Sequence, residues 1–394
     1  MRVIQTTFGT FHHFDLAHEL ERRGHLLAIL STFPWQRLKR EGLAREYVQT
    51  FAWLHTPGYL LNRYGLQRPW METWLRRANI RAFDWWSLRQ VRAMERGGAP
   101  VDALIALSGS SLHTGAHVQR RGGIFICDRG STHQRFQYDV LREEYLRWGL
   151  PAPEYDERYV AHEETIYAQA DAITVPSTAC VRSFLQMGVP ASKMHRIPYG
   201  VNLQRFKPTG LPPTDRFECL FAGHVSLRKG VPYLLQAFAA LRHPHKRLRV
   251  VGALQPELKA VLRQLPTEQV EFLGPVPQSQ LVDMMSTSHV LVLPSIEEGL
   301  ALVQAQAMAC GCPVVCSTNT GGEDLLEDGV SGFVVPVRDS KSLGERLQRI
   351  ADSVALHNSL RTAALKRVQT LGGWQAYGDT WVTLLENLTR ERQP

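Results

Sequence analysis

The chain has 394 residues, more than one hydrophobic core usually organises, so its length predicts two domains or three. Its 44% hydrophobic and 21% charged residues are typical of a globular protein and exclude a disordered or fibrous chain, and no apolar run is long enough to span a membrane. The net charge of +8 lies in residues 1–210, which hold 27 Lys and Arg against 19 Asp and Glu, whereas residues 211–394 hold 18 of each. This asymmetry indicates an anionic partner for the first half: nucleic acid, a membrane surface or a phosphorylated substrate.

Short apolar runs alternate with helical patterns along almost the whole chain. In the first half we predict strands at 3–4, 25–30, 101–107, 123–127 and 172–175, and helices at 14–23 and 177–187. After residue 217 the rhythm restarts, with strands predicted at 219–221, 248–251, 270–272, 290–293, 314–315 and 333–335. Alternating strands and helices are typical of parallel, doubly wound sheets, so the two series predict two Rossmann-like α/β domains.

A run rich in proline, residues 207–214, cannot hold a helix or a central strand and marks the linker. We therefore assign 1–206 to an N-terminal domain, 207–216 to the linker, 217–371 to a C-terminal domain, and 372–394 to a helix that packs back on the N-terminal domain. The six Cys lack the spacing of a zinc site, so we expect buried thiols in a reducing cytosol and a cytoplasmic protein.

Tryptophan and arginine interleave between residues 59 and 96, in the half that holds seven of the nine Trp. Helical spacing would bring Trp70, Trp74 and Arg77 near one another. One hypothesis is an amphipathic surface for anionic lipid or a bulky acceptor. The other is a pair of ordinary helices that pack Trp inward and leave Arg solvated.

The most informative stretch is Pro294–Ala309, where a strand ends, a turn with two carboxylates and a glycine follows, and an Ala- and Leu-rich helix begins. A helix N-terminus beside a glycine turn offers free backbone amides to an anion such as phosphate. Glu298 and Gln306 lie eight residues apart, roughly 12 Å along a helix axis. Their side chains would grip opposite ends of one elongated ligand.

Two other loops carry weaker signals. The loop Gly223–Gly230 holds the adjacent cations Arg228 and Lys229, which suit a diphosphate. The loop Thr6–Thr10, with Gly9, follows the first strand and would let a phosphate approach the backbone. Neither loop is a dinucleotide fingerprint or a P-loop.

These pieces, in this order, resemble the retaining glycosyltransferases of family four (glycosyl transferases group 1). That resemblance implies the GT-B architecture, in which two Rossmann-like domains face a central cleft. It covers nearly the whole chain and is weakest between residues 34 and 125. The matching segments include LAHELERRGH (16–25), ADAITVPS (170–177), IPYGVNLQRF (197–206), 223–230, 298–309, 311–315 and 320–332.

The resemblance implies that the C-terminal domain holds a nucleotide-diphosphate sugar. Lys229 would hold the diphosphate and Glu298 would contact the donor sugar. The sequence departs from the family at His224, where Arg is common, and at Gln306, where a second Glu contacts the ribose; an amide still bonds ribose hydroxyls. The donor-binding candidates are Gly9, His224, Arg228, Lys229, Glu298, Gly299, Leu300, Ala301, Leu302 and Gln306.

The N-terminal domain of this family takes the acceptor and lends groups near the reacting carbon. The catalytic candidates, with Glu298, are Asp128, Arg129 and His133; Arg129 stands about where the family often has a His. A competing interpretation is helix capping by Ser131 and a solvated His133. The acceptor-side candidates are His12, His13 and Glu164, with Glu163 as an alternative to Glu164.

The family implies a front-face displacement in which the leaving diphosphate helps to deprotonate the acceptor hydroxyl. The sequence has no Asp-x-Asp metal motif, so we expect no metal and no cofactor besides the nucleotide sugar as co-substrate. The expected acceptor is a glycan, a lipid-linked glycan or a small molecule, with polysaccharide biosynthesis as one setting. The motifs argue against nucleic acid and make an anionic membrane surface a further candidate partner, which would place the protein peripherally at the inner membrane face.

Two other functions stay open. Gln306 and Arg129 motivate a non-catalytic GT-B homologue that acts as a binding or scaffolding subunit. A GT-B epimerase or phosphorylase is the third hypothesis, and the epimerase version predicts product from a nucleotide sugar without any acceptor.

Overall fold

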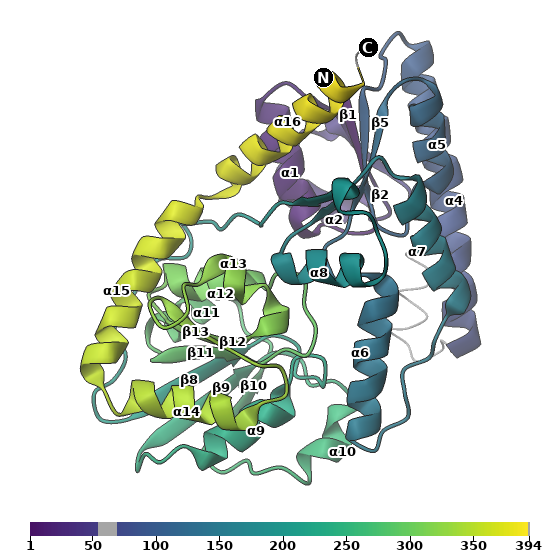
Figure 1. Cartoon of the computed structure of the whole chain (residues 1–394). Helices are drawn as coiled ribbons and strands as arrows, with labels where there is room; N and C mark the ends of the chain where they lie inside the picture. Colours follow the sequence, from purple (N-terminus) through teal and green to yellow (C-terminus); the bar gives the residue numbers. More distant parts are fainter. Residues whose placement is uncertain (54–68, 393–394) are drawn as a thin grey trace.

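The computed structural model describes residues 1–53 and 69–392 and contains two parallel sheets, one above the other in Figure 1. The first sheet has the order β3-β2-β1-β4-β5-β6-β7 and the second the order β10-β9-β8-β11-β12-β13. All their strand pairs are parallel. This confirms the predicted α/β class with two Rossmann-like units.

The strands of the first sheet are β1 (Val3–Thr7), β2 (Leu26–Ser31), β3 (Val48–Thr50), β4 (Ala103–Leu107), β5 (Ile124–Asp128), β6 (Ala172–Val175) and β7 (Met194–Arg196). Those of the second are β8 (Phe217–Ala222), β9 (Lys246–Val251), β10 (Val270–Gly274), β11 (Val290–Leu293), β12 (Val314–Ser317) and β13 (Gly332–Val335). Several inner strands are buried along their whole length, among them β1, β8, β11 and β12. Continuous apolar runs such as that of β11 are typical of parallel sheets covered on both faces.

The helices up to residue 186 are α1 (Phe11–Arg22), α2 (Trp35–Leu38), α4 (Pro69–Arg96), α5 (Leu112–Arg120), α6 (Gln134–Arg147), α7 (Glu157–Gln169) and α8 (Thr178–Gln186). Those that follow β8 are α9 (Val231–Ala240), α10 (Leu258–Leu262), α11 (Gln278–Ser286), α12 (Leu302–Ala309), α13 (Gly322–Leu325), α14 (Ser340–Ala351), α15 (Val354–Leu371) and α16 (Trp374–Glu391). Short 3₁₀ turns lie at Lys39–Glu41, Arg45–Tyr47, Ala191–Lys193 and Thr318–Thr320. The six cysteines are free and buried, as expected.

The last helix joins the two halves of the molecule. Helix α15 runs beside the second sheet, and α16 continues from it to lie against α1 (Figure 1). Arg23, which follows α1, pairs with Glu19 of α1 and with Asp379 of α16. Residues 207–216, between the two sheets, form no helix or strand. The domain limits drawn from the sequence stay a prediction.

The strand order gives each sheet one switch point. In the first sheet β1 lies between β2 and β4, and in the second β8 lies between β9 and β11. In each sheet the order in which successive strands are added therefore reverses at the first strand. Ligands of open α/β sheets bind outside the carboxyl ends of the strands at this switch point. The segments that follow β1, β5, β8 and β11 are therefore the ones to inspect for a site.

The described part of the Trp- and Arg-rich segment, residues 69–96, lies in one long helix, α4. Phe83 is buried and Trp86 stacks on Phe51, but Trp74 and Trp85 are 62% and 58% exposed. The helix therefore packs some aromatic side chains inward and presents two to solvent. Residues 54–68 and the side chain of Trp70 lie outside the described part of the chain. Among the described helices, none is long and apolar enough to cross a membrane.

Candidate active site between the two sheets

Two loops meet at the switch point of the second sheet. One follows β8 and carries His224, which is exposed, and the Arg228–Lys229 pair; the other follows β11 and ends at Gly299. The amide of Ile296 donates to the carbonyl of Arg228 over 2.8 Å. Gly230 has a φ of +66°, and a Cβ there would lie 1.9 Å from the carbonyl oxygen of Pro294. Only glycine fits this approach, which holds the two loops together.

The two cations of the first loop face the two carboxylates of the second. Lys229 forms an ion pair with Glu298. The Nε of Arg228 donates to Glu297 over 2.8 Å, and its terminal nitrogen lies 3.9 Å from Glu298. The Arg228 side chain is 37% exposed, so part of its guanidinium remains available to a ligand. The arrangement suits the binding of an anion, because two cations stand at one strand end beside a helix N-terminus.

Helix α12 begins only at Leu302, so Glu298 and Gln306 do not share a helix and the sequence-based spacing of roughly 12 Å along one axis is wrong. The helix begins three residues after Gly299. Gln306 is half-buried, whereas its neighbour Gln304 is buried and donates to the carbonyl of Thr320. Ala301 has no polar side chain to cap α12, which leaves the amides of the first turn without a side-chain partner.

The donor-side loop lies directly against the first half of the molecule. A Cβ on Gly299 would be 2.0 Å from the carbonyl oxygen of Gly130. The hydroxyl of Ser177 donates to the carbonyl of Gly299 over 2.6 Å. Leu300 and Ala301 are buried beside this contact, and Gly9 lies between β1 and α1 on the first sheet. The structure thus brings the candidates after β5 and β11 together.

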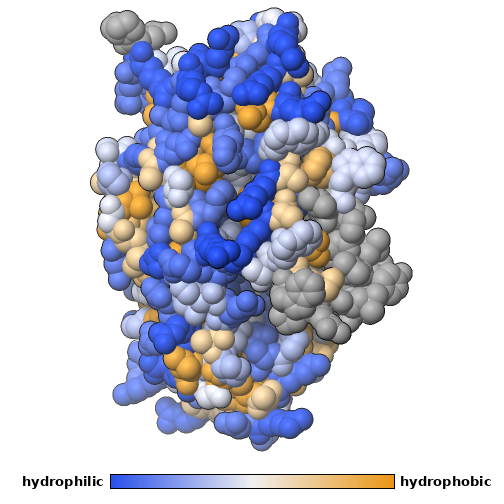
Figure 2. Space-filling view, turned by 90° about the vertical axis from the view of Figure 1, so that its right-hand side faces the viewer, coloured by the Kyte–Doolittle hydropathy of each residue, from blue (hydrophilic) through white to orange (hydrophobic). Residues whose placement is uncertain are grey.

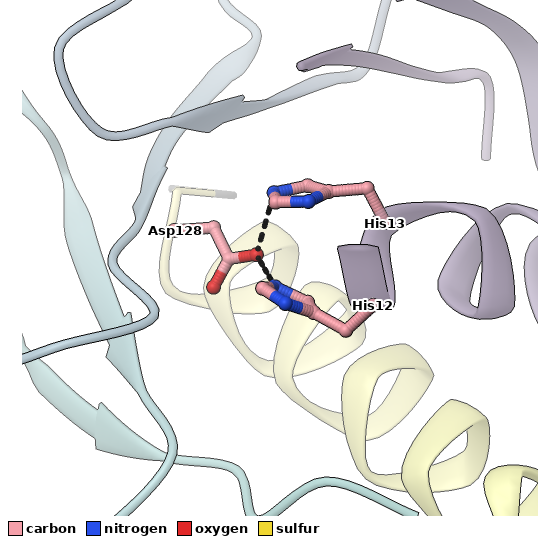
Figure 3. Close-up of side chains that lie close together, drawn as sticks. All are labelled: His12, His13 and Asp128. Carbon is pink, nitrogen blue, oxygen red and sulfur yellow. Dashed lines mark hydrogen bonds and ion pairs between the residues drawn. The ribbon is translucent and has the colours of Figure 1, made fainter. Parts of the chain in front are cut away.

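His12 and His13 reach from the first turn of α1 to Asp128 at the end of β5 (Figure 3). Their Nε2 atoms lie 2.7 and 3.3 Å from the same carboxylate oxygen, and all three side chains are buried. Burial alone would raise the pKa of Asp128, but the two histidines outweigh it and hold that pKa below its usual range. Burial and the neighbouring His13 lower the pKa of His12 to about 4. A neutral His12 that donates from Nε2 leaves Nδ1 as a buried acceptor, which has no partner among the described residues.

The low pKa of His12 predicts a loss of stability in mild acid. An unfolded histidine has a pKa of about 6.5. Between pH 6.5 and 4 the unfolded chain therefore binds a proton that the folded chain does not, and the free energy of unfolding decreases as the pH is lowered. His12 should account for about 2 kcal/mol of the stability lost between pH 7.5 and 5. Chemical denaturation at both pH values, with His12→Gln as the comparison, measures this share. An equal pH dependence in the two proteins would contradict it.

Arg129 and His133 are both buried in the first half, but in different surroundings. Arg129 donates to the carbonyl of Thr132 and lies 3.4 Å from Glu163. His133 packs against Tyr167 and Phe184, and its Nδ1 accepts from the amide of Arg135.

The competing interpretation of this segment needs correction. His133 itself caps α6 and is 2% exposed rather than solvated, because its ring fills an aromatic pocket. Ser131 donates instead to Glu297. Glu164 pairs with Arg135 near the surface, and Glu163 is buried.

Sequence reasoning missed Glu297. It is fully buried between the two halves, and Arg228 and four donated hydrogen bonds from the first half surround it. The pair of acids before Gly299 was the available signal, but only Glu298 matched the family motif.

Comparison with known families identifies the family of the chain. The family model described as "Glycosyltransferase Family 4" matches residues 10–205, and the one described as "Glycosyl transferases group 1" matches residues 204–367. The two matches adjoin at the segment that joins the sheets. The chain belongs to the family 4 glycosyltransferases.

The relatives of this chain include a protein named D-inositol 3-phosphate glycosyltransferase 1 of Catenulispora acidiphila, 32% identical over 55% of this chain and 57% of the relative. A D-inositol 3-phosphate glycosyltransferase of Thermomonospora curvata is 29% identical over 63% of this chain and 71% of the relative. The chain spans about half the length of most of the curated relatives it matches.

Solved structures share the fold of this family 4 member over nearly its whole length. A sucrose-phosphate synthase of Thermosynechococcus elongatus has a TM-score of 0.71 at 20% identity and covers 99% of this chain and 100% of its own. Anabaena HepE, solved in complex with UDP, has a TM-score of 0.69 at 16% identity and covers 98% and 100%. These likenesses establish the GT-B type of fold.

Proposed function

We propose that the protein is a glycosyltransferase that moves a sugar from a nucleotide-diphosphate sugar to a hydroxyl of an acceptor, with retention of the anomeric configuration. The observation that carries the proposal is the position of Arg228 and Lys229 beside Glu298, at the switch point of the second sheet. There the two cations and the first-turn amides of α12 would receive the diphosphate.

The chemistry follows from charge and position. As the bond to the sugar breaks, negative charge develops on the leaving diphosphate, and Arg228 and Lys229 would stabilise it. Glu298 would then exchange its contact with Lys229 for a contact with the sugar. His12 is a weak base, with a pKa of about 4. A phosphate, with a second pKa of about 6, is the better proton acceptor, which supports deprotonation of the acceptor by the leaving group.

The acceptor would bind against the first half, where His12, His13 and Asp128 offer buried hydrogen-bonding groups to a hydroxyl. The acceptor class is a glycan, a lipid-linked glycan or a small polyol. Release of nucleoside diphosphate upon addition of acceptor tests transfer, and NMR of the product's anomeric carbon tests retention. Nucleotide-sugar binding without turnover on any acceptor would instead favour a non-catalytic homologue, and product without acceptor would favour an epimerase.

We expect transfer to continue in EDTA, because Arg228, Lys229 and the α12 N-terminus supply the positive charge that a metal would otherwise provide. Rates measured with and without chelator should agree within about twofold. Loss of activity in EDTA that manganese restores would contradict this expectation. It would point to the three donor atoms of His12, His13 and Asp128, which lie within 4.8 Å of one another.

The proposed function includes contact with an anionic phospholipid surface through α4. A cavity of about 940 Å³ lies between α4, α5 and α7, with the exposed Trp74 and Trp85 at its wall and the cations Arg81 and Arg158 at its edge. Both arginines are exposed and form no ion pair within the described residues. Figure 2 shows this face, where apolar and hydrophilic residues are intermixed. Exposed Trp beside unpaired Arg suits a phosphate headgroup with its acyl chains.

Sedimentation with vesicles tests this surface. The protein should bind vesicles that contain phosphatidylglycerol, and binding should weaken with salt. The double variant Arg81→Glu/Arg158→Glu should bind about tenfold more weakly or worse. Arg263→Glu, an exposed arginine after α10 in the other half, is the matched control. Equal vesicle binding by the two variants, or binding that does not weaken with salt, would contradict the proposal that this face of α4 binds anionic phospholipid.

A further inference from the structure

Glu297 is a fully buried carboxylate at the contact between the two halves of the molecule. Its Oε1 accepts from the hydroxyls of Ser131 and Thr132, at 2.8 and 2.6 Å, and from the amide of Thr132 at 3.4 Å. Its Oε2 accepts from Nε2 of Gln137 and from Nε of Arg228, both at 2.8 Å. The donors on Oε1 and Gln137 belong to the segment after β5, and Arg228 belongs to the donor-side loop.

The same contacts extend into the core of the first half. The side-chain oxygen of Gln137 accepts from Arg129 over 3.2 Å, while its nitrogen donates to Glu297. Arg129 in turn lies 3.4 Å from Glu163. A continuous path of charged and polar side chains therefore runs from Arg129 through Gln137 and Glu297 to Arg228, the cation expected to meet the diphosphate.

Burial would raise the pKa of Glu297, but Arg228 and the hydrogen bonds from Gln137, Thr132 and Ser131 outweigh it and hold that pKa at about 2. Glu297 is therefore ionised at neutral pH and fixed on both oxygens. A buried carboxylate that accepts from so many donors has a defined position. The side chains that donate to it are therefore held in defined positions as well.

We infer that Glu297 is a positioning residue that orients Arg228 toward the diphosphate and ties it to the acceptor-side segment Ser131–Gln137. This rests on the proposed function and adds a role that Glu298 does not have. Because Glu297 uses Nε of Arg228, neither terminal nitrogen of that guanidinium is needed for this contact; one lies 3.9 Å from Glu298, and both can turn to phosphate oxygens. Donor binding and the arrangement of the acceptor side would thus be coupled through one carboxylate.

A carboxylate suits this position because the N–H groups of Thr132, Gln137 and Arg228 can only donate, and the two hydroxyls donate to it as well. Glu297→Gln keeps the shape and can still accept from Ser131 and Thr132 with its oxygen. Its amide nitrogen would then face the amide nitrogen of Gln137 and the Nε of Arg228, and in the reverse orientation it would face the amide of Thr132. In both orientations Arg228 loses the negative charge that it pairs with. The substitution should release Arg228 while it retains most of the packing.

The experiment compares Glu297→Gln with Asp324→Asn in steady-state kinetics on the full chain. Asp324 is a matched control, since its side chain is only 5% exposed and also crosses the two halves, where it accepts from Thr178 and pairs with Arg196. Glu297→Gln should raise the donor KM by about ten- to a hundredfold, the worth of a charge-assisted hydrogen bond. Asp324→Asn should leave the donor KM within about threefold of wild type.

Gln137→Ala tests the coupling from the acceptor side. Gln137 is only half-buried, so this variant should fold even where Glu297→Gln does not. It should raise the donor KM about fivefold although Gln137 lies in the acceptor half. Equal donor KM changes in Glu297→Gln and Asp324→Asn, or an unchanged donor KM in Gln137→Ala, would overturn the inference. A wild-type chain that neither binds nor turns over any nucleotide sugar would overturn the proposed function instead.

Discussion

Replacing Lys229 with Ala should lower transfer by about a hundredfold or more, mostly through weaker binding of the nucleotide sugar. Lys229 ends the loop after β8 and pairs with Glu298, so its ammonium stands where the diphosphate is expected. Removal leaves Arg228 as the neighbouring cation and leaves Glu298 without its partner. Loss of one group that stabilises developing charge typically costs a hundred- to a thousandfold. Donor affinity by calorimetry and transfer rates measure the two parts of the effect.

Lys259→Ala is the matched control for this variant. Lys259 is an exposed lysine of α10 in the same half of the molecule, away from the loops that carry the site. It should retain wild-type affinity and rate. If Lys229→Ala binds and turns over the donor as wild type does, the assigned diphosphate site is wrong.

Replacing Asp128 with Asn should lower transfer by about a hundredfold or more while donor affinity changes little. Asp128 accepts from His12 through one oxygen and from Thr174 through the other. Asparagine retains only one accepting atom, so either the His12 tautomer changes or the Thr174 hydroxyl has to turn from donor to acceptor. Either change misplaces a buried group on the acceptor side, and such groups typically contribute a hundredfold or more. The rate with saturating donor and the donor affinity measure this split.

Asp171→Asn is the control for Asp128→Asn. Asp171 accepts from the amide of Phe125 near the opposite end of β5, away from the loops between the two sheets. Its replacement should lower the melting temperature without a selective loss of transfer. Equal losses of transfer in the two variants would show that Asp128 acts only on stability.

Much of the fold could be predicted because the strands of a covered parallel sheet are short, continuous apolar segments of the sequence. The predicted strand at 172–175 coincides with β6, and 290–293 coincides with β11. The strands β3 and β7 were missed because they are three-residue edge strands, VQT and MHR, without an apolar run. Edge strands bury less surface, so their sequences carry a weaker signal.

The candidate site could be predicted only where one loop carries its own signal. Lys229 and Glu298 stand in motifs that a single sequence shows. The role of Glu297 depends on its hydrogen bond with Gln137, which is 160 residues away in the chain. The role of His12 depends in the same way on its hydrogen bond with Asp128. Contacts across a sheet or between two halves depend on topology, and no local pattern encodes them.

The most direct test of the central claim is a thermal-shift measurement of the full chain against UDP-, GDP-, ADP- and CMP-sugars. Binding to the folded state raises the melting temperature according to ligand concentration and affinity. The account predicts that one nucleotide-diphosphate sugar raises it, that the shift persists in EDTA, and that Lys229→Ala abolishes it. No shift with any nucleotide-diphosphate sugar, or a shift with the CMP-sugar alone, would contradict the account.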